Sequence, residues 1–243
     1  SQRSIRHHKT NEETSYTSTG EKLDSHWPIF KKLSETGYGS IIRSTMTLHQ
    51  VCLSKCSFCS TINRDRKDSI SLSEAKGFIK SLYFDQAAFN QKQFRSYNEL
   101  YKKYLGSDIR LRGLILSGGG QPNLWPNFSE FVDWLSQKDI DLGLITNGFP
   151  KHVDQRIYRH FKWIRLSITP EDASPFYIDG KFNNQYIPES ILQNETQTFG
   201  LSYVYGPWTT DDFLKRLDTA GINWGAKYIR LLTDCNLPRD LQL

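Results

Sequence analysis

The segment VCLSKCSFCS, residues 51–60, carries three of the chain's four cysteines within eight positions. Disulfide bonds explain this cluster poorly, because three is an odd number and such close neighbours pair badly. Short spacers do bring three thiolates to a common point, which is what an inorganic centre requires. The segment therefore indicates either a redox cluster or a zinc site.

Six short β-rich runs are spread along the chain, and the cysteine segment directly follows the first of them. The runs span residues 40–48, 113–117, 142–146, 163–169, 200–205 and 226–232. Stretches with helical spacing lie between most of them. Strands that alternate with helices predict βαβ units, a parallel sheet and right-handed crossovers. Six strands, rather than the eight of a closed barrel, predict an α/β fold of the open, partial (β/α)6 barrel type.

The helical stretches are marked by a cap and by apolar positions on one face. Ser71 and Glu74 form a capping box, since each residue can satisfy the other's exposed backbone donor. The apolar faces are formed by Ala75, Phe78, Ile79 and Leu82, by Phe128, Phe131, Val132 and Leu135, by Val153, Ile157 and Phe161, and by Phe213, Leu214 and Leu217.

The chain is expected to consist of an arm and one domain. Residues 1–39 are polar and form the N-terminal arm with a short lead-in helix, and residues 40–243 form the partial barrel. Two connections within the barrel are long. Residues 84–109 insert a further polar helix, whereas residues 170–197 are rich in turn formers and form either a substrate loop or a decorated surface turn.

Composition restricts where the chain can work. No apolar run approaches the roughly 20 residues that span a bilayer, and the first residues do not form a signal peptide, so no membrane association is expected. Clustered cysteines suggest a reducing, cytoplasmic setting in which thiols hold metal. Because the chain begins with Ser1 and its only methionine is Met46, we expect a processed chain or a fragment.

The charge is unevenly placed along the chain. The formal net charge is +5, and the stretch from Arg43 to Arg112 holds 13 Lys or Arg residues against 6 Asp or Glu. A basic surface beside the cysteines suits an anionic cofactor, a nucleic acid or an acidic peptide, but a solvated helix face is the interpretation that we favour.

The cysteine segment resembles the signature of the radical S-adenosylmethionine (radical SAM) superfamily. CLSKCSFC has the CxxxCxxC spacing, with the aromatic Phe58 before the last cysteine, and the resemblance extends over residues 40–232. It implies a [4Fe–4S] cluster on Cys52, Cys56 and Cys59 with one iron left open. That iron would chelate S-adenosylmethionine, whose reductive cleavage gives methionine and a 5′-deoxyadenosyl radical that abstracts hydrogen from a substrate.

A glycine-rich turn, Ser117 to Pro122, follows the second strand. Glycines let a ligand approach backbone N–H and C=O groups closely. The resemblance implies that Gly118, Gly119, Gly120 and Gln121 bind the methionyl amino group. The chain departs from the family here, because Gln121 stands where many members carry Glu, and this leaves the role of Gln121 open. A plain strand-to-helix turn is the alternative.

Three further residues are candidates for cofactor binding. Asn147, at the end of the third strand, can hydrogen-bond the ribose or cap a turn with Gly148. The resemblance implies that Ser167 contacts ribose or methionine and that the backbone of Phe58 hydrogen-bonds adenine. Strand alternation sets Ser167 with Arg165 on one face, where a barrel lumen would hold a polar cofactor; the reverse orientation is the alternative. No catalytic residue is assigned.

Two other functions remain open. His49 precedes Cys52 by three residues and would complete a Cys3His zinc set, which makes a zinc-stabilised, basic nucleic-acid-binding module the main alternative. A relative that keeps the cluster without catalysis is the second. The leading hypothesis needs an external one-electron reductant, flavodoxin- or ferredoxin-like. Its substrate, whether a small molecule, a peptide or a nucleotide-like molecule, is left undetermined.

Overall fold

The computed structural model describes residues 3–6, 13–16, 27–36, 41–84, 98–100, 102–103, 110–169 and 175–238. The chain forms two compact units. One contains residues 1–43 and 76–112, and the other contains residues 44–75 and 113–243. The predicted division between an arm of residues 1–39 and a barrel domain stays a prediction.

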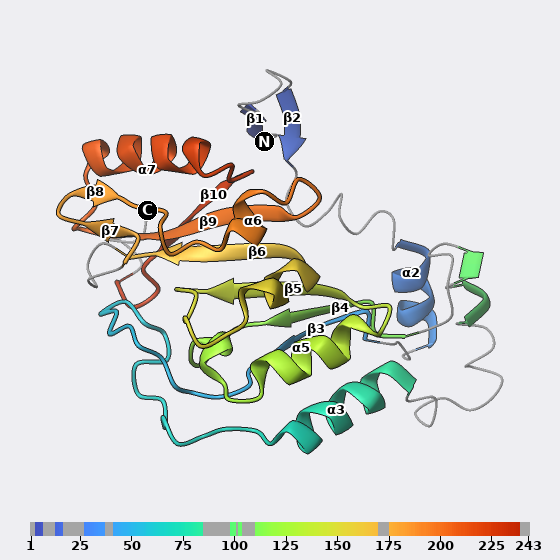
Figure 1. Ribbon diagram of the computed structural model, residues 1–243. Helices are drawn as coiled ribbons and strands as arrows, with labels where there is room; N and C mark the ends of the chain where they lie inside the picture. Colours follow the sequence, from blue (N-terminus) through green and yellow to red (C-terminus); the bar gives the residue numbers. More distant parts are fainter. Residues whose placement is uncertain are drawn as a thin grey trace. The chain divides into compact units, whose positions relative to one another are not determined.

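The second unit is built on a six-stranded parallel sheet (Figure 1). Its order is β10-β9-β6-β5-β4-β3, so each strand lies beside its neighbour in the βα sequence. This confirms the predicted partial (β/α)6 barrel. The strands are β3 (Arg43–Met46), β4 (Gly113–Leu116), β5 (Asp141–Thr146), β6 (Phe161–Ile168), β9 (Thr198–Tyr205) and β10 (Ile229–Thr233).

The two faces of this sheet differ in burial. On β6, Ile164, Leu166 and Ile168 are buried, whereas Arg165 and Ser167 between them are only partly buried. The register places Leu144 and Leu201, both fully buried, beside Ile164 and Leu166. We call the aliphatic side the packed face and the side of Ser167 the open face. The burial follows the predicted alternation.

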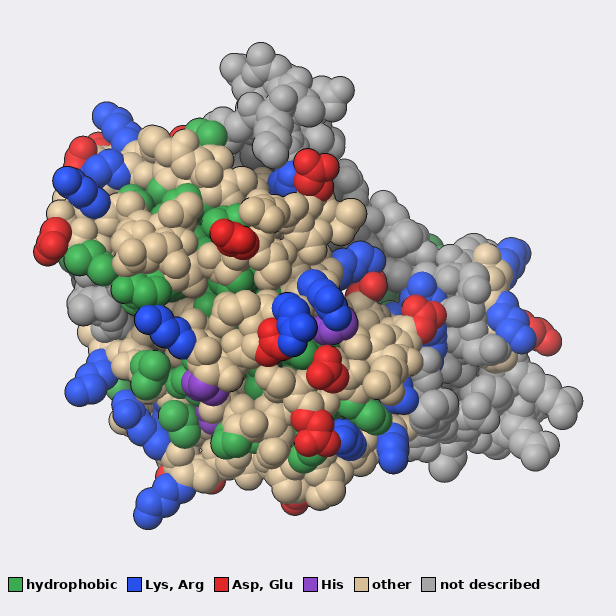
Figure 2. Space-filling model, in the orientation of Figure 1, with side chains coloured by type: hydrophobic (Ala, Val, Ile, Leu, Met, Phe, Trp, Pro, Cys, Tyr) green, Lys and Arg blue, Asp and Glu red, His purple; other side chains and the backbone are tan. Residues whose placement is uncertain are grey.

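Helices of this unit supply aromatic residues to the packed face. α5 (Phe128–Ser136) stacks Phe128 on Phe161 of β6, with ring centroids 6.1 Å apart. α7 (Asp211–Asn223) places Phe213 4.8 Å from Tyr203 of β9, again between ring centroids. Tyr203 therefore belongs to the core, whereas Lys, Arg, Asp and Glu side chains are scattered over the outer surface that Figure 2 shows.

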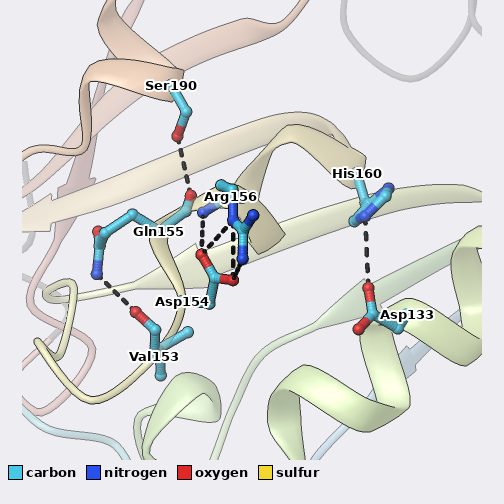
Figure 3. Close-up of polar contacts among 7 residues, drawn as sticks. All are labelled: Asp133, Val153, Asp154, Gln155, Arg156, His160 and Ser190. Atoms are coloured by element: carbon cyan, nitrogen blue, oxygen red, sulfur yellow. Dashed lines mark hydrogen bonds and ion pairs between the residues drawn. The ribbon is translucent and has the colours of Figure 1, made fainter.

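The α-helix predicted over residues 153–161 is present only as a short 3-10 helix. Residues 153–161 contain a 3-10 helix, η2 (Gln155–His160), and Phe161 already belongs to β6, where it packs on Phe128. Figure 3 shows what holds η2: Ser190 of α6 (Glu189–Leu192) donates to the Gln155 carbonyl at 3.0 Å, and His160 lies 3.5 Å from Asp133 of α5. Because η2 ends at His160, β6 begins at Phe161, two residues earlier than predicted.

The described part of the connection 170–197 contains a hairpin, β7 (Tyr177–Ile178) and β8 (Lys181–Phe182). Asp179 and Gly180 both have positive φ, as a two-residue hairpin turn demands. The rings of Tyr177 and Phe182 lie 5.1 and 5.4 Å from that of Phe213. This packing on α7 favours the surface-turn interpretation for residues 177–182.

In the first unit, β1 (Arg3–Arg6) and β2 (Glu13–Tyr16) pair antiparallel, and α2 (Trp27–Thr36) contains the predicted lead-in helix. The polar helix predicted within residues 84–109 lies mostly outside the described residues; residues 98–100 and 102–103 are helical. Within residues 27–36, 41–84, 110–169 and 175–238, no helix is long and apolar enough to cross a membrane.

α3 (Leu72–Phe84) begins at the predicted capping box. The Ser71 N–H donates to Glu74 Oε2 at 2.8 Å, and the Glu74 N–H donates to Ser71 Oγ at 3.2 Å. Ala75 and Ile79 are fully buried as predicted, but Phe78 is 44% exposed. The apolar face of α3 is therefore narrower than the sequence indicated.

Candidate functional site

The cysteine loop, residues 51–67, projects from the carboxyl end of β3, and its two ends are tied together. The Ile70 N–H donates to the Leu48 carbonyl and the Gln50 N–H to the Asp68 carbonyl, both at 3.0 Å. Inside the loop, the Cys59 N–H donates to the Cys56 carbonyl at 3.2 Å, which makes a tight turn. The loop is thus a closed structure with fixed ends.

The three predicted ligands, Cys52, Cys56 and Cys59, form no disulfide bond and are only partly buried. Polar side chains point hydrogens at two of the sulfurs. Arg64 Nη1 donates to Cys59 Sγ at 3.0 Å, and Asn147 Nδ2 donates to Cys52 Sγ at 3.4 Å. Such donors favour the thiolate, which is the form that binds iron or zinc.

Cys59 shows this effect in its acidity. Burial raises the pKa of the thiol, but the hydrogen bonds from Thr61 and Arg64, with the positive charge of Arg64, outweigh burial and hold the pKa below its ordinary value of 9.0. Neither Thr61 nor Arg64 was singled out from the sequence. The signal was present, because both lie within five residues of Cys59.

The glycine turn lies directly against the start of the cysteine loop. The Gly120 N–H donates to the His49 carbonyl at 3.2 Å, and the Gln121 N–H donates to the Val51 carbonyl at 2.7 Å. A Cβ on Gly120 would lie 2.1 Å from the Val51 oxygen, so only glycine fits. The structure thus brings two predicted motifs together through their backbones.

Conformation also requires glycine in this turn. Gly118 and Gly119 have φ of 79° and 56°, in the left-handed region. The Gly119 carbonyl accepts a hydrogen bond from Thr61 Oγ1 of the cysteine loop at 3.2 Å. The glycine turn is therefore attached to the start of the cysteine loop, through His49 and Val51, and again to the loop at Thr61.

The Gln121 side chain is directed at Gly148. It is 4% exposed, and its Nε2 donates to the Gly148 carbonyl at 3.3 Å. The same carbonyl accepts hydrogen bonds from Asn123 Nδ2 and Thr146 Oγ1, each at 2.8 Å. Gln121 therefore helps to fix the turn that carries Asn147, a role that its amide supplies without a charge.

Asn147 lies where the third predicted strand ends, and its amide nitrogen is committed to the cysteine loop through Cys52 and Ser54. Its Oδ1 is buried and has no hydrogen-bond partner. Burying a carbonyl oxygen without a donor is costly, so this atom is available to a ligand hydroxyl or amine.

Phe58 stacks on Trp208, with ring centroids 5.5 Å apart and planes inclined by 25°. Trp208 lies in the turn that follows β9, so it approaches the cysteine loop from a strand remote in the sequence. Sequence reasoning missed Trp208, because nothing in the pattern pairs it with Phe58.

Ser167 lies farther into the sheet, on the open face. Its Oγ is 3.2 Å from Ser202 Oγ on β9, and the register sets Arg230 of β10 beside Ser202. The structure gives Ser167 this neighbour rather than a contact with the cysteine loop. Ser202 was missed because strand register decides the pairing.

Aromatic rings fill the other half of the open face, toward the amino ends of the strands. The Trp163 ring lies where a Cβ on Gly143 would be, at 2.3 Å, and the Tyr228 ring does the same at Gly200. These rings cover the open face at Gly143 and Gly200, on the amino-terminal side of Ser167.

The residues around the three thiols bear on the kind of centre that they could hold. Among the residues that the structure describes, no three His, Cys, Asp or Glu side chains are grouped so as to hold a metal ion. His49, the fourth zinc ligand of the alternative, is buried with Nε2 2.7 Å from the Gln121 carbonyl oxygen. The thiol donor set and the open Asn147 Oδ1 fit a cluster with a polar ligand.

A cavity of about 230 Å³ lies at the opposite, amino-terminal edge of the sheet. Its lining includes Asp141 and Lys162, which form an ion pair of 2.6 Å with each other, both well exposed. The cavity contains none of the predicted site residues. We therefore place the candidate site at the carboxyl edge, where parallel sheets hold ligands.

No family model matches the chain, and no curated protein matches it. Solved structures do. Streptococcus suis SuiB bound to the precursor peptide SuiA matches with a TM-score of 0.57 at 15% identity, covering 92% of this chain and 46% of SuiB. SuiB bound to S-adenosylmethionine matches with a TM-score of 0.54 at 15% identity, covering 95% of this chain and 50% of SuiB.

TYW1 with a lysine–pyruvate adduct aligns with a TM-score of 0.47 at 15% identity, covering 95% of this chain and 78% of TYW1. The chain spans about half the length of SuiB. The likeness to SuiB concerns the fold alone. The chain thus has a partial-barrel fold that it shares with SuiB.

Proposed function

We propose that this chain is a radical SAM enzyme that holds a [4Fe–4S] cluster on Cys52, Cys56 and Cys59. When bound, the cluster would supply the electron that cleaves S-adenosylmethionine to methionine and a 5′-deoxyadenosyl radical for hydrogen abstraction. The observation that carries the proposal is the cysteine loop at the carboxyl end of β3, with donors aimed at two of its sulfurs.

The polar groups around the loop have distinct tasks in this proposal. Arg64 stabilises the Cys59 thiolate, and its positive charge also offsets part of the negative charge that three thiolates bring to the loop. Asn147 donates to Cys52 and holds the loop against the end of β5. A hydrogen bond to a ligand sulfur also tunes the electron affinity of an iron–sulfur cluster.

The glycine turn and the open face would bind S-adenosylmethionine. Because the Gln121 side chain is buried and turned to Gly148, we propose that backbone carbonyls of Gly118 and Gly120, rather than Gln121, receive the methionyl ammonium. Asn147 Oδ1 would accept a hydrogen bond from a ribose hydroxyl. The hydroxyls of Ser167 and Ser202 would donate hydrogen bonds to the ribose or accept them from it. The backbone of Phe58 would hydrogen-bond adenine.

The substrate class is proposed from the likeness in fold to SuiB, and the partner from the need for an electron. SuiB, similar in fold, is known with a bound precursor peptide, so a peptide heads our proposed substrate classes, before a small molecule or a nucleotide-like molecule. A flavodoxin- or ferredoxin-like protein would provide the electron. The four cysteines include no disulfide among the described residues, in keeping with a cytoplasmic site of action.

The test is anaerobic reconstitution with iron and sulfide, followed by S-adenosylmethionine and dithionite. We expect 5′-deoxyadenosine and methionine in equal amounts, detected by liquid chromatography and mass spectrometry. Cys56→Ala should abolish both products, whereas Cys235→Ser, which changes an exposed thiol past β10, should leave them unchanged.

Two outcomes would contradict the proposal. A reconstituted protein that binds cluster but forms no 5′-deoxyadenosine would be a non-catalytic relative. Equal product from wild type and Cys56→Ala would show that the chemistry lies elsewhere.

A further inference from the structure

We propose that Trp208 is a ligand-binding residue, whose indole N–H donates a hydrogen bond to the nucleoside half of S-adenosylmethionine. This inference rests on the proposed function and adds to it a residue outside every motif of the sequence. It is drawn from four properties of Trp208: its stacking, its unpaired N–H, its rigid support and its place along the sheet edge.

The indole is in direct contact with the cysteine loop. Its stacking partner, Phe58, lies between Cys56 and Cys59, so the ring of Trp208 lies next to the candidate cluster site. Offset aromatic pairs at this separation attract each other beyond what area burial contributes. Trp208 therefore holds part of the cysteine loop against the end of β9.

The indole N–H has no partner. Trp208 Nε1 is buried and makes no hydrogen bond, although a buried indole normally donates one. A buried donor left without an acceptor destabilises the structure, because the donor has lost its hydrogen bond to water. A bound ligand can supply the missing acceptor. In the proposed function, S-adenosylmethionine binds on the open face at the edge of the sheet that carries Trp208.

The turn that carries Trp208 is rigid. The Thr209 N–H donates to the Gly206 carbonyl at 2.9 Å, and the Gly206 N–H donates to Thr209 Oγ1 at 3.0 Å. Thr209 Oγ1 also lies 2.9 Å from the hydroxyl of buried Tyr203. A Cβ on Gly206 would lie 2.4 Å from the indole, so glycine lets the ring lie flat against the strand end. The donor is pre-positioned before any ligand arrives.

Strand order assigns the half of the ligand that Trp208 meets. The glycine turn follows β4, whereas Trp208 follows β9, and β5 and β6 lie between these strands. A ligand whose ammonium is held at the glycine turn reaches β9 only with its other end. That end is the adenosine, in which the N1, N3 and N7 ring nitrogens and the ribose oxygens can accept a hydrogen bond.

The experiment compares Trp208→Phe with Trp134→Phe, a matched control on α5. Phenylalanine keeps an aromatic ring against Phe58 and Gly206 but lacks the N–H. We expect unchanged iron content in both variants and about tenfold weaker S-adenosylmethionine binding in Trp208→Phe alone, measured by calorimetry on the oxidised holoprotein.

Ligand fragments then locate the contact. Binding of 5′-deoxyadenosine should weaken in Trp208→Phe as much as that of S-adenosylmethionine, and methionine binding should not change. A loss confined to methionine would overturn the assignment to the nucleoside. Unchanged affinity for all three ligands would overturn the inference altogether.

A measurement on the wild-type protein needs no variant to fold. The ultraviolet resonance Raman band that reports hydrogen bonding of indole N–H should shift when S-adenosylmethionine is added, and the shift should be absent in Trp208→Phe. No shift in a wild-type protein that binds the cofactor would contradict the inference. A wild-type protein that binds neither cluster nor cofactor would instead contradict the proposed function.

Discussion

On β6, neighbouring side chains belong to two different environments. Ile164, Leu166 and Ile168 are fully buried on the packed face, to which α5 and α7 contribute aromatic rings. Arg165 and Ser167, one residue apart from them, are only partly buried on the open face. Burial of apolar area stabilises the packed face. The open face carries polar groups and open hydrogen-bonding capacity, which is what a ligand site needs.

The largest effect expected from this comparison is on stability. Leu166→Ala should lower the free energy of unfolding by about 2–5 kcal/mol, because a buried leucine leaves a cavity when truncated. Ser167→Ala, the neighbour on the open face, should change it by less than about 1 kcal/mol. Urea denaturation followed by circular dichroism measures both. Equal costs would show that the two faces do not divide these roles.

A smaller effect is expected at the contact between the two motifs. Gly120→Ala places a methyl group 2.1 Å from the Val51 carbonyl oxygen, so the glycine turn must move away from the cysteine loop, at a cost of about 1–3 kcal/mol. The amount of iron that the Gly120→Ala protein retains after reconstitution should fall as well.

The matched control for that substitution is Gly77→Ala in α3, where no atom lies within 4 Å of the new methyl group. It should stabilise the chain by about 0.5–1 kcal/mol, since alanine is the better helix former. If Gly120→Ala behaved like this control, the contact between the two motifs would have no energetic weight.

The smallest effect concerns the acidity of Cys59. Its pKa in the folded chain lies below the ordinary 9.0, so its contribution to stability is complete only above that pH and is lost as the pH falls through the folded pKa. Arg64→Gln removes a donor and a positive charge, and the pKa of Cys59 should rise.

Alkylation of the metal-free protein by iodoacetamide, followed at Cys59 by mass spectrometry, measures this shift. The midpoint of the rate against pH should move to higher pH in Arg64→Gln. A midpoint that stays in place would mean that Arg64 does not act on the thiolate.

Much of the fold was predictable because it depends on local pattern. Six β-rich runs, the capping box at Ser71 and the apolar faces of α5 and α7 each follow from residues close in sequence. The failures came from tertiary packing. Phe161 packs on Phe128 as part of a strand rather than ending a helix, and Phe78 is exposed although it fits the helical period.

The site was predictable only in part, for a related reason. The cysteines can be predicted from their spacing, and the glycines from the backbone conformations and close approaches that only glycine allows. Trp208 and Ser202 become site residues through the order and register of β6 and β9, which no local pattern specifies. The structure also gave Gln121 a role, since its hydrogen bond to Gly148 fixes the turn of Asn147.

The central claim is that the cysteine loop holds a four-iron cluster, and the metal content of the protein tests it most directly. After anaerobic reconstitution with iron, sulfide and zinc all present, we expect about four irons and four sulfides per chain in wild type and in Cys235→Ser, and a loss of both in Cys56→Ala. One zinc per chain with no sulfide would contradict the account.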